Sequence, residues 1–345
     1  MKFSIAVNME RYDPAQDMRS VAANALDLVK MADQGGFEIA WAAEHHAIEM
    51  TIAPGPFQIL MHWAAHTQTI RLGTAVIVAP YWHPLRLAGE AALCDVLTDG
   101  RLELGIARGA YQYEFDRMAG GIDGREGVAH MKEILPAVKA LWQGDYAHEG
   151  DHWTFPTSTS VPKPLQDPHP PIWVAARDSG SFDWAFKVGA NLLTTPLQKP
   201  NAEIKVLGDR FDETAANNPE IPRPRFLMMR RACVYDRPED IAVPASASVE
   251  FARRFENLFL NAGGVTNGFP EPVDTEVITE RADYSVETLN ENLLFGTPDE
   301  VVEKLKLYED AGVDNFCYNP VFGIDHKFAC RSLELFIERV MPQFH

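Results

Sequence analysis

The chain has 345 residues, of which 46% are hydrophobic, and 49 acidic against 31 basic residues give it a formal net charge of −18. Such an acidic surface repels a phosphate backbone, so we expect no nucleic-acid partner. No apolar run reaches the ~18 residues of a membrane-spanning helix, so we expect no membrane partner. The first apolar run is too short for a secretory signal, and we expect a cytoplasmic protein.

Four cysteines are spread along the chain and form no C-x-x-C pair. They are Cys94, Cys233, Cys317 and Cys330. In a chain of this length, wide spacing is typical of reduced cysteines. It favours neither a disulfide framework nor a zinc site.

Short apolar runs alternate with amphipathic segments along almost the whole chain. Eight runs are predicted to be buried strands: 3–8, 37–43, 70–79, 101–108, 171–176, 189–195, 225–235 and 313–320. They lack polar alternation, as parallel strands do when both faces are covered. Eight such strands separated by helices predict a single α/β domain over residues 1–345, a closed parallel (β/α)8 TIM barrel.

The helical segments show apolar residues at spacings of three and four. Predicted helices begin around Val21 and cover 57–68, 84–97, 125–142, 181–188, 200–216, 237–262 and 325–341. Gly35 and Gly36 are expected to end the first of them. Thr297 to Glu300 has the form of a capping box with proline at the first helical position, so another helix is expected to begin there and to end at Gly312.

Two segments are longer than ordinary loops. Residues 143–171 and 263–296 are rich in Pro, Gly, Asp and Asn. Long insertions in a barrel are often lids or specificity loops, and we expect these two to choose the substrate.

The chemistry of such a barrel is expected at the carboxyl ends of its strands. The second predicted strand ends at Glu44, His45 and His46. Histidine can donate or accept a proton near neutral pH, so His45 beside Glu44 is an acid–base candidate; the alternative is that one histidine packs and the other is solvated.

Other histidines carry weaker signals. His62 and His66 lie four apart on a predicted helix and could present two metal ligands. No third ligand or H-E-x-x-H motif accompanies them, so an ordinary outer helix face is favoured and no metal site is predicted. His83, before Pro84, is expected simply to start a helix.

Two neighbouring strand ends could hold a phosphate. Arg108 ends the fourth strand and precedes a glycine, and the run Arg177-Asp178-Ser179-Gly180-Ser181 joins the fifth strand to a short helix. A guanidinium, serine hydroxyls and the amides of a helix N-terminus all suit an anion. The alternative for Ser179 or Ser181 is plain helix capping. No G-x-G-x-x-G, P-loop or G-x-S-x-G motif is present.

Five segments resemble the bacterial luciferase-like flavin monooxygenases, in the order in which that family has them. They are GFEIAWAAEHH (36–46), IRLGTAVIVAPYWHPLRLAGE (70–90), DGRLELGIARGAYQYEF (99–115), PPIWVAARDSGS (170–181) and GTPDEVVEKLKLYEDAGVDNF (296–316). One motif such as EHH is modest support, whereas five in order span almost the whole chain. The central insert and residues 195–290 match weakly.

The resemblance implies a (β/α)8 barrel, usually a homodimer, that binds FMN at the strand carboxyl ends. The family receives FMN already reduced by a separate NAD(P)H-dependent flavin reductase, and oxygenates its substrate with molecular oxygen through a flavin hydroperoxide. By position, Ala75 and Val76 flank the flavin ring through a cis peptide bond. Arg108 is similar to the family's phosphate-binding arginine.

Further positions follow from the same resemblance. Ala176, Arg177, Ser179 and Ser181 fall in the family's second phosphate loop. His45 matches the family's catalytic histidine, with Glu44 beside it and Tyr111 nearby.

Two positions depart from the luciferase α subunit. Ala107 stands where that subunit has a reactive cysteine, which argues against light emission. Arg177 stands where it has a glutamate, and the added cation should favour a phosphate.

We therefore expect a monooxygenase that uses reduced FMN and oxygen on a small aldehyde, ketone or aromatic compound. A closed pocket lined by Trp41, Trp82 or Trp173 would exclude water, although each tryptophan alone is expected in the core. The main alternative is hydride transfer with a deazaflavin on the same barrel. A flavin-binding protein without activity and a metal hydrolase are the others.

Overall fold

The computed structural model describes residues 1–260 and 263–344, and eight parallel strands close into a barrel. The barrel strands are β1 (Lys2–Ala6), β2 (Ile39–Ala42), β3 (Arg71–Thr74), β5 (Leu102–Ala107), β8 (Ile172–Ala175), β9 (Asn191–Thr194), β10 (Phe226–Val234) and β14 (Asn315–Asn319). Each pairs with the next, and β14 pairs with β1. The predicted TIM barrel is confirmed.

Helices surround the barrel, nearly all in the places that the apolar spacing predicts. They are α1 (Met18–Gln34), α2 (Pro56–Ala64), α3 (Pro84–Leu97), α5 (Gly127–Gln143), α6 (Ser179–Lys187), α7 (Ala202–Asn217), α8 (Ala242–Leu260), α11 (Pro298–Asp310) and α12 (His326–Leu335). Gly35 caps α1, and Gly36 follows with φ 81°. The N–H of Thr297 donates to Glu300 at 2.7 Å at the start of α11, which confirms the capping box. Residues 261 and 262, predicted as the end of α8, lie outside the described residues.

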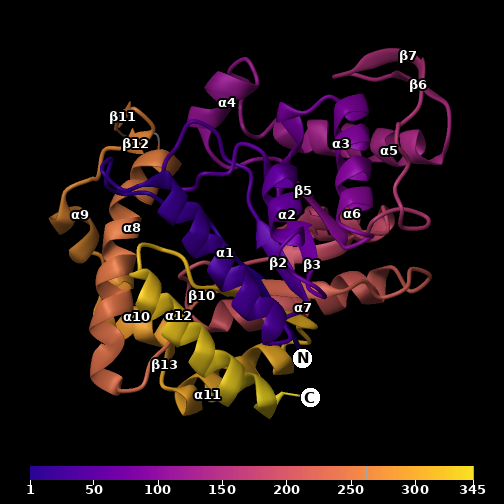
Figure 1. Ribbon diagram of the computed structural model, residues 1–345. Coiled ribbons are helices and arrows are strands. Elements are labelled where there is room, and N and C mark those ends of the chain that lie inside the picture. The colour runs from indigo at the N-terminus through magenta and orange to yellow at the C-terminus, as the bar shows by residue number, and fades with distance from the viewer. Residues whose placement is uncertain (261–262, 345) are drawn as a thin grey trace.

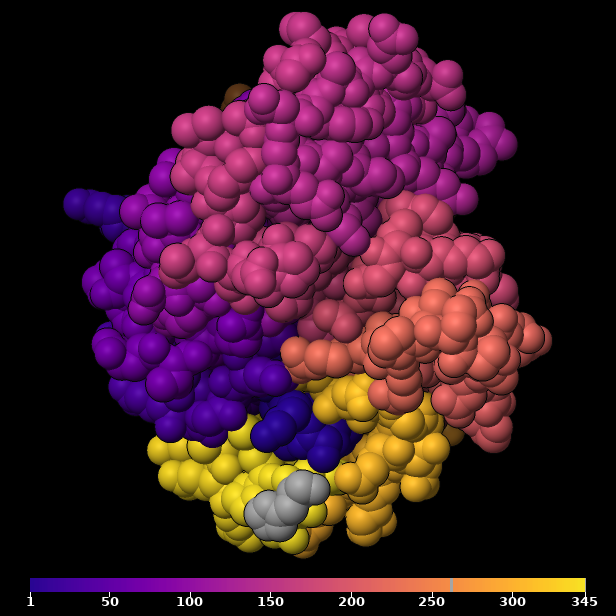
Figure 2. All heavy atoms as spheres, turned by 90° about the vertical axis from the view of Figure 1, so that its right-hand side faces the viewer, coloured from indigo at the N-terminus to yellow at the C-terminus, as the bar shows by residue number. Residues whose placement is uncertain are grey.

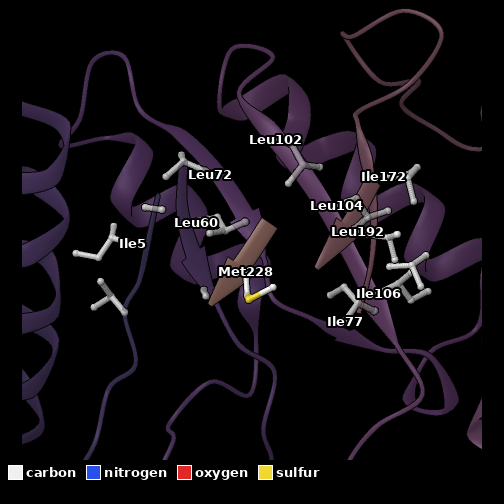
Figure 3. Close-up of a cluster of buried hydrophobic side chains, with 14 of the residues drawn as sticks. Ile5, Leu60, Leu72, Ile77, Leu102, Leu104, Ile106, Ile172, Leu192 and Met228 are labelled. Carbon is white, nitrogen blue, oxygen red and sulfur yellow. The ribbon is translucent and has the colours of Figure 1, made fainter. Parts of the chain in front are cut away.

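Alternate residues of each strand face opposite sides of the barrel wall. Leu192 and Met228 belong to the large cluster between strands and helices, whereas their neighbours Leu193 and Leu227 belong to a smaller inner cluster with Trp41 and Trp173. Figure 3 shows the outer set, with Leu102, Leu104 and Ile106 spaced along β5. This double burial explains why the strands are uniformly apolar.

The third strand differs from its prediction as one continuous run over 70–79. β3 ends at Thr74, and after Ala75 and Val76 the chain resumes as β4 (Ile77–Val78). β3 pairs with both β2 and β5, whereas β4 pairs with β5. The break therefore leaves Ala75 and Val76 outside the ladder, at the carboxyl end of the barrel.

The two insertions contain secondary structure that was not predicted. Residues 143–171 form the hairpin β6 (Tyr146–Glu149) and β7 (Thr154–Ser158), which packs on α5. Residues 263–296 contain the small hairpin β11 (Val265–Thr266) and β12 (Phe269–Pro270), the helices α9 (Thr275–Thr279) and α10 (Val286–Asn292), and β13 (Leu294–Gly296). β13 extends the sheet beside the end of β10. A short helix, α4 (Gln112–Met118), was also not predicted.

The arrangement of these parts is visible from two sides. Figure 1 shows the two termini side by side, away from α4 and the hairpin β6–β7. In Figure 2 the first residues of the chain, in indigo, lie among the last ones, in yellow, as expected where β1 lies beside β14. No helix in residues 1–260 and 263–344 is long and apolar enough to cross a membrane.

Candidate active site

The floor of the candidate site is the inner apolar cluster of the barrel. Trp41 and Trp173 pack edge to face there, with ring centroids 5.5 Å apart. Ala75 and Val76 are partly buried against this cluster, and Ala175 joins them from the end of β8. The bond between Ala75 and Val76 is cis, as the resemblance implies. The floor is thus a small-residue, apolar surface at the carboxyl ends of the strands.

His45 follows β2 and is fixed by a carboxylate from α4. Its Nδ1 lies 3.1 Å from Oε2 of Glu114 and 3.2 Å from Oε1. The side chain of Glu114 is 1% exposed, and its Oε1 also accepts the backbone N–H of His46 at 2.6 Å. A carboxylate only accepts hydrogen bonds, so it favours the tautomer with the proton on Nδ1. Nε2 of His45, which bonds to nothing among the described residues, then presents a lone pair.

Glu44 belongs to the same segment, and both oxygens of its carboxylate are hydrogen-bonded. Its carboxylate accepts from the N–H of Val78 at 2.6 Å, from Nε1 of Trp82 at 2.9 Å, and pairs with Nε2 of His46 at 3.0 Å. It is 2% exposed. Glu44 therefore ties the EHH segment to the turn after β4, and its predicted catalytic role stays a prediction.

An aromatic wall extends from His45 across the barrel mouth. The ring centroid of Tyr111 lies 5.1 Å from that of His45, and the ring centroid of Phe255 lies 6.2 Å from that of Tyr111. Phe251, one turn earlier on α8, stacks on Phe255 with centroids 5.6 Å apart. Burial, and secondarily Glu114, raises the pKa of Tyr111 well above its usual range, so its hydroxyl stays protonated. The structure brings His45 and Tyr111 together, as predicted.

A hollow of about 430 Å³ opens beside His45. Its wall includes Tyr113 from α4, Ile48 and Ile52 from the loop after β2, and Val265 and Gly268 from the hairpin β11–β12. The N–H of Glu49 donates to the carbonyl of Gly268 at 2.7 Å, which joins that hairpin to the mouth. Of the two predicted specificity loops, 263–296 therefore reaches His45. Residues 143–171 do not line this hollow, because their hairpin packs on the outer helix α5.

The two predicted phosphate turns lie on neighbouring strands. β5 pairs with β8 through Ile106 and Val174, so Arg108 and Ala176 follow at adjacent strand ends. Both Arg108 and Arg177 are exposed, and neither side chain forms an ion pair or hydrogen bond with any described residue. Gly127, at the start of α5, packs on the carbonyl of Arg108 so closely that a Cβ would lie 2.3 Å from it.

The capping of α6 is more specific than the sequence alone indicates. Asp178 is the cap, and it accepts from the N–H of Ser181 at 3.0 Å and from its hydroxyl at 2.7 Å. Ser181 thus uses its side chain in the cap, whereas Ser179 and Gly180 are exposed at the first turn. Arg210 from α7 donates to the carbonyl of Arg177 and holds this turn.

The residues present fit a flavin. The indole N–H of Trp41, in the floor, is buried with no partner among the described residues, and so is the hydroxyl of Thr194 at the end of β9. Unpaired buried donors are costly, and the polar edge of an isoalloxazine ring offers them partners. Arg108 and Arg177 are exposed cations of the kind that its phosphate would need.

Besides Glu114, two further charged residues of the site were missed in the sequence. Arg231, on β10, has its guanidinium carbon 3.8 Å from the centroid of Phe251 and 5.8 Å from that of Phe322. Glu10, after β1, is 8% exposed; its Oε2 accepts from the hydroxyl of Tyr12 at 2.8 Å and from the N–H of Gly323 at 2.9 Å. The alternation Leu227, Met229, Arg231 could have placed Arg231 inside the barrel, because the first two face inward.

The remaining sequence candidates have structural roles. His62 on α2 and His66 in the turn after that helix pack edge to face, with ring centroids 5.1 Å apart. His83 caps α3, its Nδ1 accepting the N–H of Leu85 at 3.2 Å, as expected. Trp41, Trp82 and Trp173 are all buried, as expected of core residues, and Trp41 and Trp173 also form the floor of the candidate site.

Comparison with known proteins bears on the family and the fold. The model of the luciferase-like monooxygenase family matches residues 1–315. The chain belongs to this family. The predicted family and the predicted class of activity, a flavin-dependent monooxygenase, are confirmed.

One relative is similar over its whole length. The "flavin-dependent trigonelline monooxygenase, oxygenase component" of Acinetobacter baylyi is 40% identical over 344 residues, covering 100% of this chain and 96% of the relative.

Two solved structures share the fold with a TM-score of 0.77 each. The oxygenating constituent of 3,6-diketocamphane monooxygenase of Pseudomonas putida, in complex with FMN, is 18% identical and covers 100% of this chain and 99% of its own. An F420-dependent secondary alcohol dehydrogenase is 17% identical, with the same coverage. At this identity the likeness shows the fold and does not distinguish FMN from a deazaflavin.

Proposed function

We propose that this protein is the oxygenase component of a two-component monooxygenase. It binds FMN that a separate NAD(P)H-dependent reductase has reduced, and oxygenates a nitrogen-heteroaromatic carboxylate of the trigonelline class. Support for the two-component arrangement and for the substrate comes from the relative that is 40% identical over the whole chain. Support for FMN comes from the two arginine turns, which suit a terminal phosphate.

The observation that carries the proposal is the position of His45 after the carboxyl end of β2, which pairs through Ala42 with Thr74, the residue before Ala75 and Val76 of the floor. Reduced FMN, when bound, supplies the electrons that activate molecular oxygen. Trp41, Ala75 and Val76 would support the ring, and Arg108, Ala176, Arg177 and the exposed amides at Ser179 and Gly180 would hold the phosphate; Ser181, bound to Asp178, orients that turn.

His45 provides the acid–base group. Its Nε2 takes up a proton from a reacting atom in the hollow, and the carboxylate of Glu114 stabilises the resulting imidazolium. Tyr111 and Phe255 would exclude water beside His45, so that activated oxygen reacts with the substrate rather than with water. Tyr111, a protonated phenol, can also donate a hydrogen bond to the substrate.

The test is oxygen transfer to substrate. Purified protein, FMN, NADH and a flavin reductase are supplied with trigonelline under ¹⁸O₂, and mass spectrometry measures the ¹⁸O content of the product. Incorporation of one ¹⁸O atom supports the proposal. No oxygenated product from trigonelline or from related aromatic carboxylates, aldehydes and ketones would refute it, and substrate-dependent reduction of F420 would establish the deazaflavin alternative.

A variant pair tests His45. We expect His45→Ala to lower kcat roughly 10²- to 10⁴-fold, the usual contribution of a general acid or base, while FMN affinity is retained. His66→Ala, an exposed change in the turn after α2, is the control and should match the wild type. Full turnover by His45→Ala would remove this residue from the mechanism.

We also propose a homodimer in the cytoplasm, on the resemblance to the family. Light scattering of the purified protein measures its mass directly, and a monomer at micromolar concentration would exclude the dimer.

A further inference from the structure

Arg231 is a cation without an anion inside the barrel mouth. Its guanidinium forms no ion pair and donates no hydrogen bond to any residue in 1–260 or 263–344, although the residue is half-buried. Its neighbour on the strand, Arg230, instead donates to Asn201, Tyr308 and two carbonyls on the outer side. A partly buried guanidinium that lacks an acceptor is costly, and such groups normally have one.

The strand directs Arg231 towards the reaction site. Leu227 and Met229 of β10 pack in the inner cluster with Trp41, Ala75 and Val76. Side chains two residues apart on a strand point to the same face. Arg231 therefore stands one step above Met229, towards the carboxyl end, in the layer over the floor.

The guanidinium is held in place by rings. The ring centroid of Phe251 lies 3.8 Å from the guanidinium carbon, and that of Phe322 lies 5.8 Å from it. Stacking fixes the plane of the group and leaves its N–H edge for a ligand. The aromatic wall connects Phe251 to Phe255, Tyr111 and finally His45.

The charges around Arg231 fit an anionic ligand attached to an aromatic body. The groups near enough to act on its charge include Tyr284, Glu10, Tyr12 and Tyr111. Glu10 is the carboxyl group among them, and it bonds to Tyr12 and Gly323 and forms no ion pair with Arg231. The other three are phenols, and these ionise only at alkaline pH.

We propose that Arg231 binds the carboxylate of the organic substrate, and that the site accepts aromatic and heteroaromatic carboxylates in preference to their neutral analogues. This inference rests on the proposed function, of which it names the substrate-recognition residue. A planar carboxylate matches the guanidinium edge in a bidentate pair. The ring of the same molecule would lie against the aromatic wall towards His45.

The experiment compares carboxylates with their amides by binding alone. Titration calorimetry on protein loaded with oxidised FMN compares nicotinate with nicotinamide and benzoate with benzamide, whose amides are neutral, and compares trigonelline with its cationic amide 1-methylnicotinamide. We expect the wild type to prefer at least one carboxylate at least tenfold over its amide. Arg231→Gln should weaken that carboxylate by roughly 10- to 100-fold, the scale of a lost charged hydrogen bond, and change the amide little.

Three controls make the result decisive. Arg231→Lys keeps the charge without the planar fork and should retain part of the affinity, which covers the case in which Arg231→Gln does not fold. Arg223→Gln removes another guanidinium beside a ring, 4.8 Å from the centroid of Phe211 but exposed and before the start of β10, and should bind as the wild type does. FMN affinity is measured for each variant.

Three results would overturn the inference. They are a wild type that prefers none of the carboxylates, an Arg231→Gln variant that binds them unchanged, and a loss of FMN affinity that parallels the loss of substrate. The binding experiment needs no turnover, so the two proposals can fail separately. If the ¹⁸O₂ experiment fails and the carboxylate preference is retained, the proposed function is rejected and carboxylate binding by Arg231 stands.

Discussion

Nδ1 of His45 lies 3.1 Å from Oε2 of Glu114, although 69 positions separate the two residues in the chain. The same carboxylate accepts the N–H of His46, so α4 fixes both the ring and the backbone of the EHH segment. This contact gives His45 a defined tautomer, which a solvated histidine at a strand end would lack.

Replacing Glu114 with glutamine should separate positioning from folding. The amide oxygen can still accept the N–H of His46, so we expect the fold to persist. Its NH₂ group can donate to Nδ1 and favour the tautomer with the proton on Nε2, so that Nε2 no longer offers a lone pair to the reacting atom. We expect kcat to fall at least roughly tenfold, and ¹⁵N NMR of the imidazole to report the changed tautomer. Wild-type kcat with wild-type ¹⁵N shifts would show that Glu114 does not act through His45.

The phosphate turns make a prediction about flavin affinity. Arg108 and Arg177 are exposed cations at adjacent strand ends. Arg108→Ala should weaken FMN binding by about 1–3 kcal/mol, and Arg177→Ala by a similar amount. Riboflavin lacks the phosphate, so its affinity should change little in either variant. Quenching of flavin fluorescence gives both constants; Arg125→Ala, an exposed loop change, is the control. Equal effects on FMN and riboflavin would place the arginines away from the phosphate.

Most of the barrel could be predicted because parallel strands covered on both faces are apolar runs of limited length. The runs 101–108 and 171–176 match β5 and β8 within one residue at each end. Runs 70–79 and 263–296 could not be predicted in detail. The first is apolar on both sides of its break at Ala75 and Val76, and the second owes its short elements to packing on α8 and β10.

The candidate site was predictable where it depends on strand ends. His45, Ala75, Arg108 and Arg177 gather because the carboxyl ends of parallel strands meet. Glu114 and Glu10 were missed because each comes from a connection whose path the sequence does not specify. Glu114 precedes a phenylalanine in GAYQYEF, and nothing in that string shows that its carboxylate turns back to His45.

Glu44 offers a test of structural against catalytic roles. Its carboxylate satisfies the buried N–H groups of Val78 and Trp82 and pairs with His46. Glutamine keeps one acceptor oxygen, and its NH₂ group cannot accept from the N–H of Val78 or of Trp82. Glu44→Gln should therefore lower the free energy of unfolding by about 1–3 kcal/mol. Chemical denaturation measures this, with Glu213→Gln, exposed on α7, as the control. Turnover per folded molecule should stay near that of the wild type; a large loss with unchanged stability would instead support the predicted catalytic role.

Glu10 gives the protein a specific pH dependence. Burial is the largest cause that raises its pKa from the usual 4.5 to about 7, while its bonds to Tyr12 and Gly323 act in the opposite direction. The folded state therefore binds this proton more tightly than the unfolded state does. The stability that the protonated group contributes is fully present below pH 4.5 and is lost as the pH rises through about 7.

A neutral replacement should remove this loss. Glutamine at position 10 can still accept from Tyr12 and Gly323, so Glu10→Gln should gain stability relative to the wild type between pH 5 and pH 8. At ~1.4 kcal/mol per pKa unit, the full shift corresponds to roughly 3 kcal/mol. Thermal and urea unfolding of both proteins at the two pH values measure the difference, and Glu213→Gln, exposed on α7, shows how an ordinary glutamate behaves. Parallel pH curves for the wild type and Glu10→Gln would mean that Glu10 is ionised in the folded protein as readily as in the unfolded chain.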